Sequence, residues 1–185
     1  AEPLGLGHAV RQARSFAAGE PIAVLLPDDI FECPRPCLRQ ILDVAERRQA
    51  PAVALLKVAA NELSKYGIVE AAPVEDRLYR LTGMVEKPEP AMAPSDLAIV
   101  GRYVVTPDIF DVLDKLRPGV GGEIQLTDAL LALSKRRELY GYEFEGTRHD
   151  LGDRLGFLKA QIAFGLKRPD LADGLRAYLK SVIRS

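Results

Sequence analysis

Tryptophan, cysteine and histidine are scarce in this chain, and the shortage excludes a common kind of site. Its 185 residues include no Trp, two Cys and two His. A structural zinc site needs about four soft ligands at recognisable spacing, which Cys33, Cys37, His8 and His149 do not provide. With two cysteines and no signal peptide at its start, the sequence predicts a protein of the reducing cytoplasm.

An excess of charge of one sign and long apolar runs are also missing. Lys and Arg number 25 against 26 Asp and Glu, so the chain offers no basic surface to a nucleic-acid backbone or an anionic membrane. The longest apolar runs, such as residues 22–26 and 52–56, are far shorter than the ~18 residues of a membrane span. The motif Gly-x-Ser-x-Gly is absent, which removes support for acyl transfer. Neither nucleic acid nor a membrane is therefore an expected partner.

What remains is an ordinary globular composition, 48% apolar and 28% charged. Continuous apolar runs predict a fully buried strand at residues 22–26 and a strand of the buried, parallel type at residues 52–58, with a helix at 36–48 between them. This strand–helix–strand order predicts an α/β layered sheet. Three further strand-like runs have no helix between them, which favours antiparallel pairing of residues 66–71, 78–85 and 97–105.

Further helices are predicted around these strands. Apolar spacing places them at residues 7–18, 107–116 and 124–136, with a last strand at 139–144. Residues 153–185 read as two helices separated by Arg168-Pro169-Asp170. The prediction is one α/β domain over residues 1–185, of which 153–185 form a helical tail. The apolar face of that tail suits packing on the core and pairing in a homo-oligomer equally well.

Two carboxylates stand where strands are predicted to end. Asp28 follows the strand at residues 22–26, and Asp150 lies between a strand and a helix. Ligands bind at the carboxyl ends of strands in open α/β sheets, and Mg²⁺ prefers carboxylate oxygens. Asp29 is the weaker candidate, because only one of two adjacent side chains can point into a site. Taken alone, each of these residues is explained as well or better by a turn or a helix cap.

Glycines and charged residues at other predicted ends suit a phosphorylated ligand. Gly5 and Gly7 precede a helix, where backbone N–H groups can approach a base, ribose or phosphate, although a loop that needs positive φ explains them equally well. Gly67 opens a strand to close approach by a ligand. Glu86 suits sugar hydroxyls and Lys87 suits phosphate, although an exposed Glu-Lys pair at a strand end is common.

A glycine pair, Gly121 and Gly122, is predicted to open the helix at residues 124–136. Glu123 then lies near the positive end of the helix dipole, where a capping role explains it.

Seven segments in a fixed order carry a resemblance that none of them carries alone. They are Gly5-Leu-Gly-His-Ala-Val10, Leu26-Pro-Asp-Asp29, Tyr66-Gly-Ile-Val69, Val85-Glu-Lys-Pro88, Ile99-Val-Gly-Arg-Tyr103, Gly121-Gly-Glu-Ile-Gln-Leu-Thr-Asp128 and Asp150-Leu-Gly-Asp153. Together they resemble the bacterial UTP–glucose-1-phosphate uridylyltransferases, a family of sugar nucleotidyltransferases, over almost the whole chain.

The resemblance implies a Rossmann-like mixed sheet flanked by helices and a magnesium-dependent reaction of UTP with glucose 1-phosphate, giving UDP-glucose and pyrophosphate. Such catalysis positions two anions and neutralises their repulsion, which makes Lys87 and Asp28 the expected catalytic residues. The implied roles are Mg²⁺ ligation by Asp28 and Asp150, contact with uridine at Gly5 and Gly7, contact with glucose hydroxyls at Gly67 and Glu86, an additional sugar-side contact at Glu123, and binding of the sugar phosphate by Lys87.

The chain departs from the family pattern at its front. It begins at Ala1 without Met, and the family's first strand and its loop Gly-x-Gly-Thr-Arg, followed by Pro-Lys, do not occur. The chain is therefore expected to be the carboxyl-terminal part of such an enzyme, incomplete at its N-terminus. A thymidylyl or guanylyl sugar transferase of the same fold is the alternative within this class. A non-catalytic sugar-nucleotide-binding or subunit-interaction fragment is the alternative from another class.

Overall fold

The computed structural model describes residues 4–183, and its contacts divide the chain into two compact units. The larger unit runs from the start of the described chain to Leu26 and again from Cys33 to Glu145. The smaller unit contains Pro27–Glu32 and the chain from Gly146 onward. None of the helices described within residues 4–183 has the length and hydropathy needed to cross a membrane.

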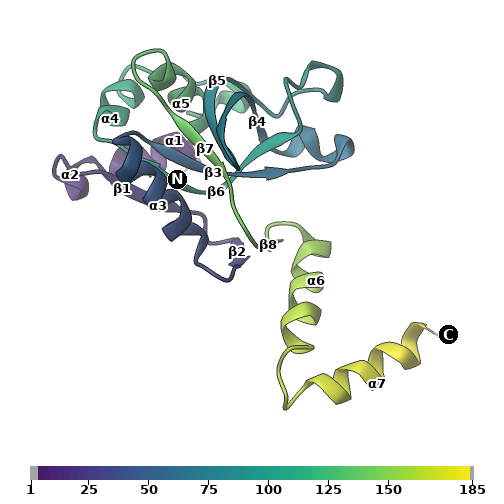
Figure 1. The fold of residues 1–185 in the computed structure, drawn as a ribbon. Helices are drawn as coiled ribbons and strands as arrows, with labels where there is room; N and C mark the ends of the chain where they lie inside the picture. The colour runs from purple at the N-terminus through teal and green to yellow at the C-terminus, as the bar shows by residue number, and fades with distance from the viewer. Residues whose placement is uncertain (1–3, 184–185) are drawn as a thin grey trace. The chain divides into compact units, whose positions relative to one another are not determined.

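The larger unit is built on a six-stranded mixed sheet in the order β1-β6-β3-β7-β5-β4 (Figure 1). Its strands are β1 (Ile22–Leu25), β3 (Ala52–Lys57), β4 (Gly67–Glu75), β5 (Leu78–Glu86), β6 (Leu97–Val105) and β7 (Tyr140–Glu143). Strands β3 and β7 are parallel, and the other paired strands are antiparallel. A mixed sheet flanked by helices confirms the predicted fold class, and the antiparallel pairing expected for the three middle strands is also confirmed.

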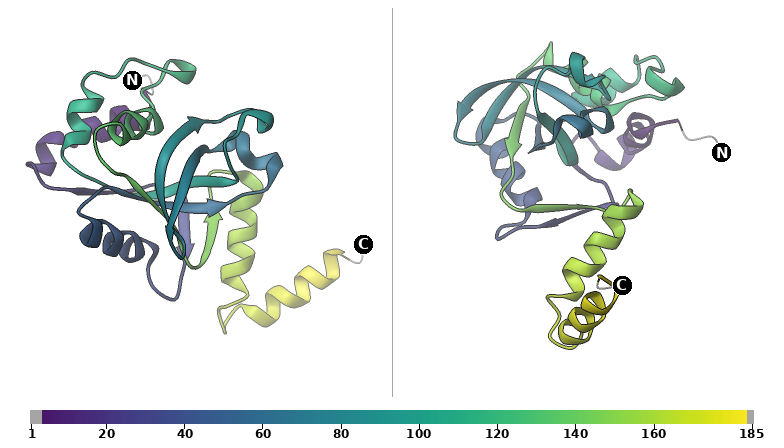
Figure 2. Two further views of the ribbon diagram at one scale, coloured as in Figure 1. Left: turned by 45° about the horizontal axis from the view of Figure 1, so that its top comes forward. Right: turned by 90° about the vertical axis from the view of Figure 1, so that its right-hand side faces the viewer.

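Helices cover both faces of this sheet (Figures 1 and 2). On one face lies α3 (Cys37–Arg48), and on the other lie α1 (Leu6–Gln12), α4 (Asp108–Leu113) and α5 (Leu126–Ser134). Alternate residues of a strand point to opposite faces, and Val53 and Leu55 of β3 join the core beneath the second group of helices. The remaining short elements of this unit are α2 (Arg14–Ala17), η1 (Ala60–Lys65), η2 (Pro90–Met92) and η3 (Val120–Gly122).

Two predictions for the first 26 residues are wrong. The single helix expected at residues 7–18 is broken at Ala13, whose ψ of 0° interrupts the helix between α1 and α2. The strand at residues 22–26 is not fully buried, because β1 lies at the edge of the sheet and pairs, among the described strands, with β6 only. Its residues alternate between half-buried and exposed, with Leu25 49% exposed, as expected for a strand covered on one face.

The smaller unit begins with a two-stranded antiparallel ladder that the sequence did not predict. It is formed by β2 (Asp29–Glu32) and β8 (Thr147–Asp150). Helix α6 (Arg154–Gly165) follows, and the side chain of Asp153 caps it by accepting a hydrogen bond from the N–H of Gly156 at 2.9 Å. Lys167 donates to Glu32, so an ion pair joins the segment just after α6 to the ladder.

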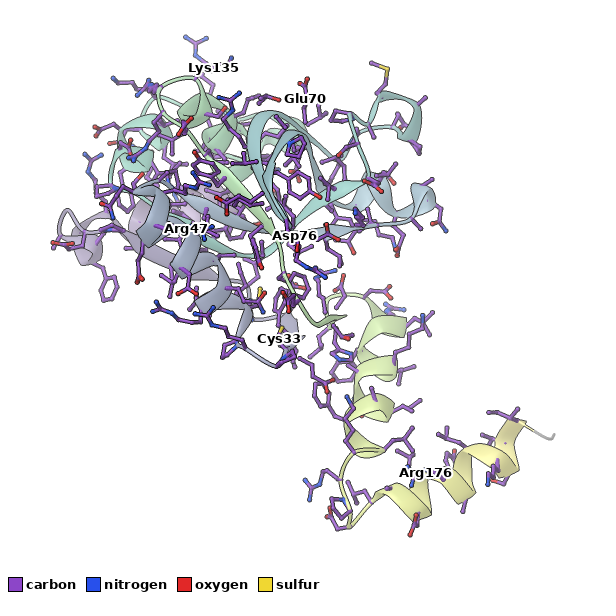
Figure 3. The ribbon with its side chains drawn as sticks, viewed as in Figure 1. Cys33, Arg47, Glu70, Asp76, Lys135 and Arg176 are labelled. Atoms are coloured by element: carbon purple, nitrogen blue, oxygen red, sulfur yellow. The ribbon has the colours of Figure 1, made fainter. Side chains whose placement is uncertain are left out.

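The two helices predicted in the tail are confirmed as α6 and α7 (Ala172–Ile183), and residues 184–185 of that prediction lie outside the described part of the chain. Each helix buries a single residue, Ala160 in α6 and Ala172 in α7. Arg176 of α7, labelled in Figure 3, forms an exposed ion pair with Asp173 at 3.4 Å. The apolar face of the tail is thus left largely open to solvent, and a groove of about 530 Å³ separates the two helices.

Candidate active site

Asp28 and Asp150 are brought together at the end of the β2–β8 ladder. The N–H of Leu151 donates to the carbonyl of Asp28 at 2.7 Å, which joins the two chain segments just beyond the ladder. Asp28 Oδ2 and Asp150 Oδ1 lie 2.9 Å and 3.3 Å from the point that a Cβ on Gly152 would occupy. Because residue 152 is glycine, the space between the two carboxylates stays open.

This pair fits a hard divalent cation. Its donors are carboxylate oxygens, which Mg²⁺ prefers, and Mg²⁺ commonly takes one or two carboxylates and completes its coordination with water and substrate phosphates. Within residues 4–183 no group of three or more His, Cys, Asp or Glu side chains is arranged to hold a metal ion. The pair Asp28 and Asp150 supplies two carboxylates, which suits a Mg²⁺ ion that is shared with phosphates.

The adjacent carboxylate, Asp29, has different surroundings from Asp28. Its side chain is 3% exposed and forms an ion pair with Arg148 at 2.5 Å. Burial raises the pKa of Asp29 above its usual range, and the nearby Arg148 charge opposes only part of that rise. Asp28 is thus the one of these two carboxylates that lies beside the position of a Cβ on Gly152, whereas Asp29 is buried against Arg148.

In the larger unit, the start of α1 packs tightly against the segment before α5, and Gly7, expected to precede the helix, is its second residue. The N–H of Gly7 donates to the carbonyl of Ile124 at 2.8 Å, and the N–H of Ile124 donates to the carbonyl of Leu4 at 2.9 Å. A Cβ on Gly5, whose φ is +92°, would lie 2.8 Å from the Cβ of Glu123, and one on Gly7 would lie 2.7 Å from the carbonyl oxygen of Ile124. Both glycines are required for this contact, which places Glu123 beside Gly5.

Glu123 does not cap a helix, because α5 begins at Leu126 with Gln125 as its N-cap. The Glu123 carboxylate accepts a hydrogen bond from Gln125 Nε2 at 3.1 Å instead. The expected start of this helix at residue 124 is therefore two residues too early.

Gly67 and Glu86 form a second cluster with Thr127 of α5, which we call the β4–β5 corner. Gly67 and Glu86 are partners in the β4–β5 ladder. Thr127 Oγ1 donates to Glu86 Oε2 at 2.6 Å, and both oxygens lie within 3.1 Å of the position of a Cβ on Gly67. Thr127 thereby fixes the carboxylate of Glu86 over a residue without a side chain. The sequence did not reveal this role of Thr127, although Thr127 lies only four residues after Glu123.

Lys87 adjoins this corner and has a strained backbone. Its φ of +47° lies in the left-handed region, which residues other than Gly, Asn and Asp seldom occupy. The N–H of Lys87 donates to the carbonyl of Tyr66 at 2.9 Å, which holds this conformation, and the side chain is exposed. Backbone strain of this kind clusters at functional sites, so it adds a structural reason to consider Lys87 functional.

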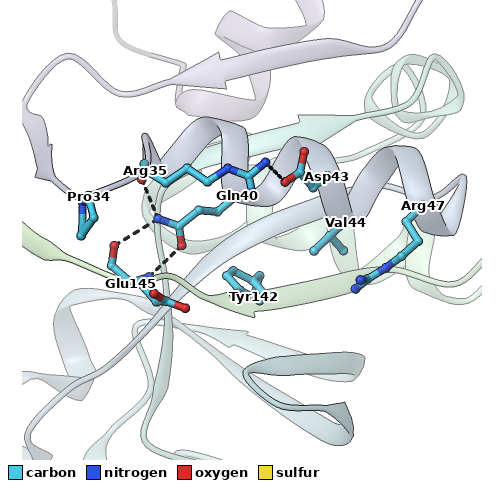
Figure 4. A pocket seen from close by; sticks show the side chains of 8 residues that line it. All are labelled: Pro34, Arg35, Gln40, Asp43, Val44, Arg47, Tyr142 and Glu145. Carbon is cyan, nitrogen blue, oxygen red and sulfur yellow. Dashed lines mark hydrogen bonds and ion pairs between the residues drawn. The ribbon is translucent and has the colours of Figure 1, made fainter.

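A separate cavity of about 190 Å³ lies between α3 and β7 (Figure 4). Gln40 is buried beside it, and its amide donates to the carbonyls of Arg35 and Glu145 at 2.7 Å and 3.0 Å and accepts from the N–H of Glu145 at 2.8 Å. These bonds tie α3 to the end of β7. The buried amide of this cavity is satisfied by the protein itself, so it has a structural role.

The raised pKa of Asp128 should make the stability of the protein depend on pH. Burial raises the pKa of this carboxyl in the first turn of α5, so the folded protein keeps its proton to a higher pH than the unfolded chain, where Asp ionises near pH 4. The free energy of unfolding therefore falls as pH rises between these two pKa values. We expect Asp128→Asn to be more stable than the wild type at pH 7 and to lose this advantage toward pH 4. Chemical denaturation across that range measures it, and equal stabilities at pH 7 would contradict the prediction. Asp173→Asn, at a side chain 99% exposed, is the control.

Known proteins are similar to this chain over most of its length. Proteins named UTP–glucose-1-phosphate uridylyltransferase from Staphylococcus epidermidis (strain ATCC 35984) and Streptococcus pneumoniae serotype 4 are 42% and 45% identical, over 98% and 96% of this chain and 63% and 61% of their own lengths. A crystal structure of UDP-glucose pyrophosphorylase complexed with UDP-glucose matches with a TM-score of 0.88 and 40% identity, over 90% of this chain and 64% of that one.

The chain therefore spans somewhat less than two thirds of the relatives it matches. The family model described as nucleotidyl transferase matches residues 1–164, which is most of the chain. On this match, together with the mixed sheet and its flanking helices, the chain belongs to the nucleotidyl transferase family.

Proposed function

We propose that this chain belongs to an enzyme that converts UTP and glucose 1-phosphate into UDP-glucose and pyrophosphate. The observation that carries the proposal is the β4–β5 corner, where Thr127 fixes the carboxylate of Glu86 over Gly67, next to the exposed ammonium of Lys87. A fixed carboxylate beside a cation suits a phosphorylated sugar. The names of the relatives at 42% and 45% identity, and the solved structure complexed with UDP-glucose, support this choice of substrates.

In the proposed reaction, the residues of the larger unit bind and orient. Glu86 accepts hydrogen bonds from glucose hydroxyls, and Gly67 lets the sugar approach β4. Lys87 binds the sugar phosphate and offsets its charge. Gly5 and Gly7, at the start of α1, lie against the uridine, with Glu123 as an additional sugar-side contact. Holding two reactants in an attack geometry supplies a large part of the rate enhancement in reactions of this kind.

The bond changes need no covalent enzyme intermediate. A phosphate oxygen of glucose 1-phosphate attacks the α-phosphorus of UTP, one P–O bond forms, and the bond to the β-phosphate breaks as pyrophosphate leaves. Asp28 and Asp150 are the proposed ligands of Mg²⁺. When bound, this ion supplies neutralisation of phosphate charge, which permits two anions to approach each other.

Two finer features also belong to the proposal. We place the protein in the cytoplasm, because a sequence of 185 residues with two cysteines suits a reducing compartment. We also propose self-association through the tail, because Leu158, Tyr178 and Ile183 are 56%, 63% and 80% exposed on its two helices. Light scattering of the whole protein measures this association, and a monomer at micromolar concentration would contradict it.

Glu86→Gln and Thr127→Val test the substrate assignment. A hydrogen bond to a charged group contributes about 1.5–3 kcal/mol, so we expect kcat/KM for glucose 1-phosphate to fall roughly 10- to 100-fold in Glu86→Gln and about tenfold in Thr127→Val. Pyrophosphate release by the whole protein measures both. Glu70→Gln on β4 (Figure 3), an exposed Glu outside the corner, is the matched control and should leave kcat/KM unchanged.

The same assay separates the alternatives. Preference for dTTP or GTP over UTP would replace the uridylyl assignment with a thymidylyl or guanylyl one. Binding of UDP-glucose without any turnover would favour a non-catalytic sugar-nucleotide-binding protein. Equal effects of Glu70→Gln and Glu86→Gln would contradict the role given to the β4–β5 corner.

A further inference from the structure

Arg148 lies between two carboxylates that face each other across the β2–β8 ladder. The register places Asp29 directly opposite Asp150, and Arg148, two residues before Asp150 on β8, shares its face of the strand. Like charges directly opposite each other destabilise a ladder. Arg148 bonds to both, with Nε donating to Asp29 Oδ1 at 2.6 Å and Nη2 donating to Asp150 Oδ2 at 3.1 Å. The guanidinium is thus what permits two acids on one face.

The inner part of this arrangement is buried and the outer part is accessible. The side chains of Arg148 and Asp29 are 10% and 3% exposed, whereas that of Asp150 is 31% exposed. The buried ion pair with Asp29 therefore holds Arg148 in place, and Arg148 in turn holds the more exposed Asp150.

The two oxygens of Asp150 have different surroundings. Oδ2 accepts from Arg148, whereas Oδ1 accepts from the N–H of Gly152 at 3.0 Å and faces the space shared with Asp28. Two donors thus fix the plane of the carboxylate. Oδ1 is the oxygen turned toward the carboxylate of Asp28.

We propose that Arg148 is a positioning residue for the divalent cation, holding Asp150 so that Oδ1 is presented beside Asp28. The inference rests on the proposed function, because it takes Asp28 and Asp150 to be the cation ligands. Arg148 acts only through Asp150. Groups that hydrogen-bond to a ligating carboxylate typically change metal affinity by about 10- to 100-fold.

Simple electrostatics predicts the opposite change in cation affinity when Arg148 is replaced. A guanidinium close to a bound cation repels it, so loss of the positive charge alone would tighten cation binding. Loss of the positioning bonds would weaken it. The direction of the change therefore decides between the two effects.

The experiment measures Mn²⁺ binding, as a substitute for Mg²⁺, to the whole protein without nucleotide by electron paramagnetic resonance. We expect the Kd for Mn²⁺ to rise about 10- to 100-fold in Arg148→Gln and also to rise in Arg148→Lys, which keeps the charge but loses the fork of donors. Arg154→Gln removes an exposed positive charge at the start of α6 and is the control, with an unchanged Kd.

A folding defect is separated from a loss of positioning by a second variant. Arg148→Gln alone leaves the buried Asp29 carboxylate without the guanidinium, which is strongly destabilising. The double variant Asp29→Asn with Arg148→Gln removes both charges. We expect its thermal midpoint to return toward that of the wild type while its Kd for Mn²⁺ stays raised, because Asp150 has still lost its donor.

Two different results would overturn the proposal, and only the second would also remove the cation site. Mn²⁺ binding that is unchanged or tighter in Arg148→Gln and in the double variant, while Asp28→Asn abolishes it, would remove the role of Arg148 and leave the cation site intact. Mn²⁺ binding that is unaffected by Asp28→Asn and Asp150→Asn would remove the cation assignment itself, and with it part of the proposed function.

Discussion

Replacing Asp28 or Asp150 with Asn is expected to lower kcat for pyrophosphate release by about a thousandfold. The two carboxylates flank one open space above Gly152, and a single amide substitution halves the charge available to a cation there. A bound metal ion contributes several kcal/mol to reactions of phosphate groups, and about 4 kcal/mol corresponds to roughly a thousandfold in rate. Steady-state kinetics of the whole protein over a range of Mg²⁺ concentrations measure the loss.

The adjacent carboxylate provides an informative contrast. Asp29→Asn removes the buried partner of Arg148, so it should lower the thermal midpoint while reducing kcat much less than Asp28→Asn. Asp173→Asn on α7, at a fully exposed side chain, should change neither quantity. Retention of more than a tenth of the wild-type kcat by both Asp28→Asn and Asp150→Asn would contradict the metal-site assignment.

The sequence was most informative where long apolar patterns decide the structure. Strands β5 and β6 and helix α3 lie within one residue of their predicted bounds, because each buries a clear apolar pattern: one face of β5 and α3, and nearly all of β6. Strand β1 was misjudged because an apolar run does not reveal whether a strand is central or at an edge. The β2–β8 ladder escaped prediction because each strand has four residues, and Thr147-Arg-His-Asp150 has no apolar alternation.

In the candidate site, too, features of neighbouring residues were predicted, whereas contacts between residues far apart in the sequence were not. Glu86 and Lys87 adjoin in sequence, so their strand-end pattern was visible. Asp28 and Asp150 were singled out separately, but only the fold shows that they share one space. Arg148 and Thr127 were not recognised as partners of carboxylates. Thr127 and Glu86 are 41 residues apart, and a hydrogen bond between such distant residues produces no pattern in the sequence. Arg148 had a weak local signal, since it lies two residues before Asp150 and alternate strand residues share a face.

Gly156→Ala should disrupt the same carboxylate from the side of the helix. Gly156 lies in the first turn of α6, where a Cβ would overlap the carbonyl oxygen of Asp150 and lie 3.2 Å from its carbonyl carbon. Backbone atoms cannot rotate out of the way, so either α6 or Asp150 must move. Overpacking costs about 1–3 kcal/mol of stability, and a displacement of about 1 Å at a catalytic group can cost roughly a hundredfold in rate.

A second helical glycine in the same unit supplies the matched control. Gly174 lies in α7 with no heavy atom within 4 Å of the position of an added Cβ, so Gly174→Ala should stabilise the protein by about 0.5–1 kcal/mol, as this exchange does inside an unobstructed helix. Chemical denaturation, kcat and Mn²⁺ affinity measured on both variants separate helix propensity from the contact with Asp150. If Gly156→Ala gained stability as Gly174→Ala does and kept its affinity for Mn²⁺, then close packing of α6 on Asp150 could not be what holds this carboxylate in place.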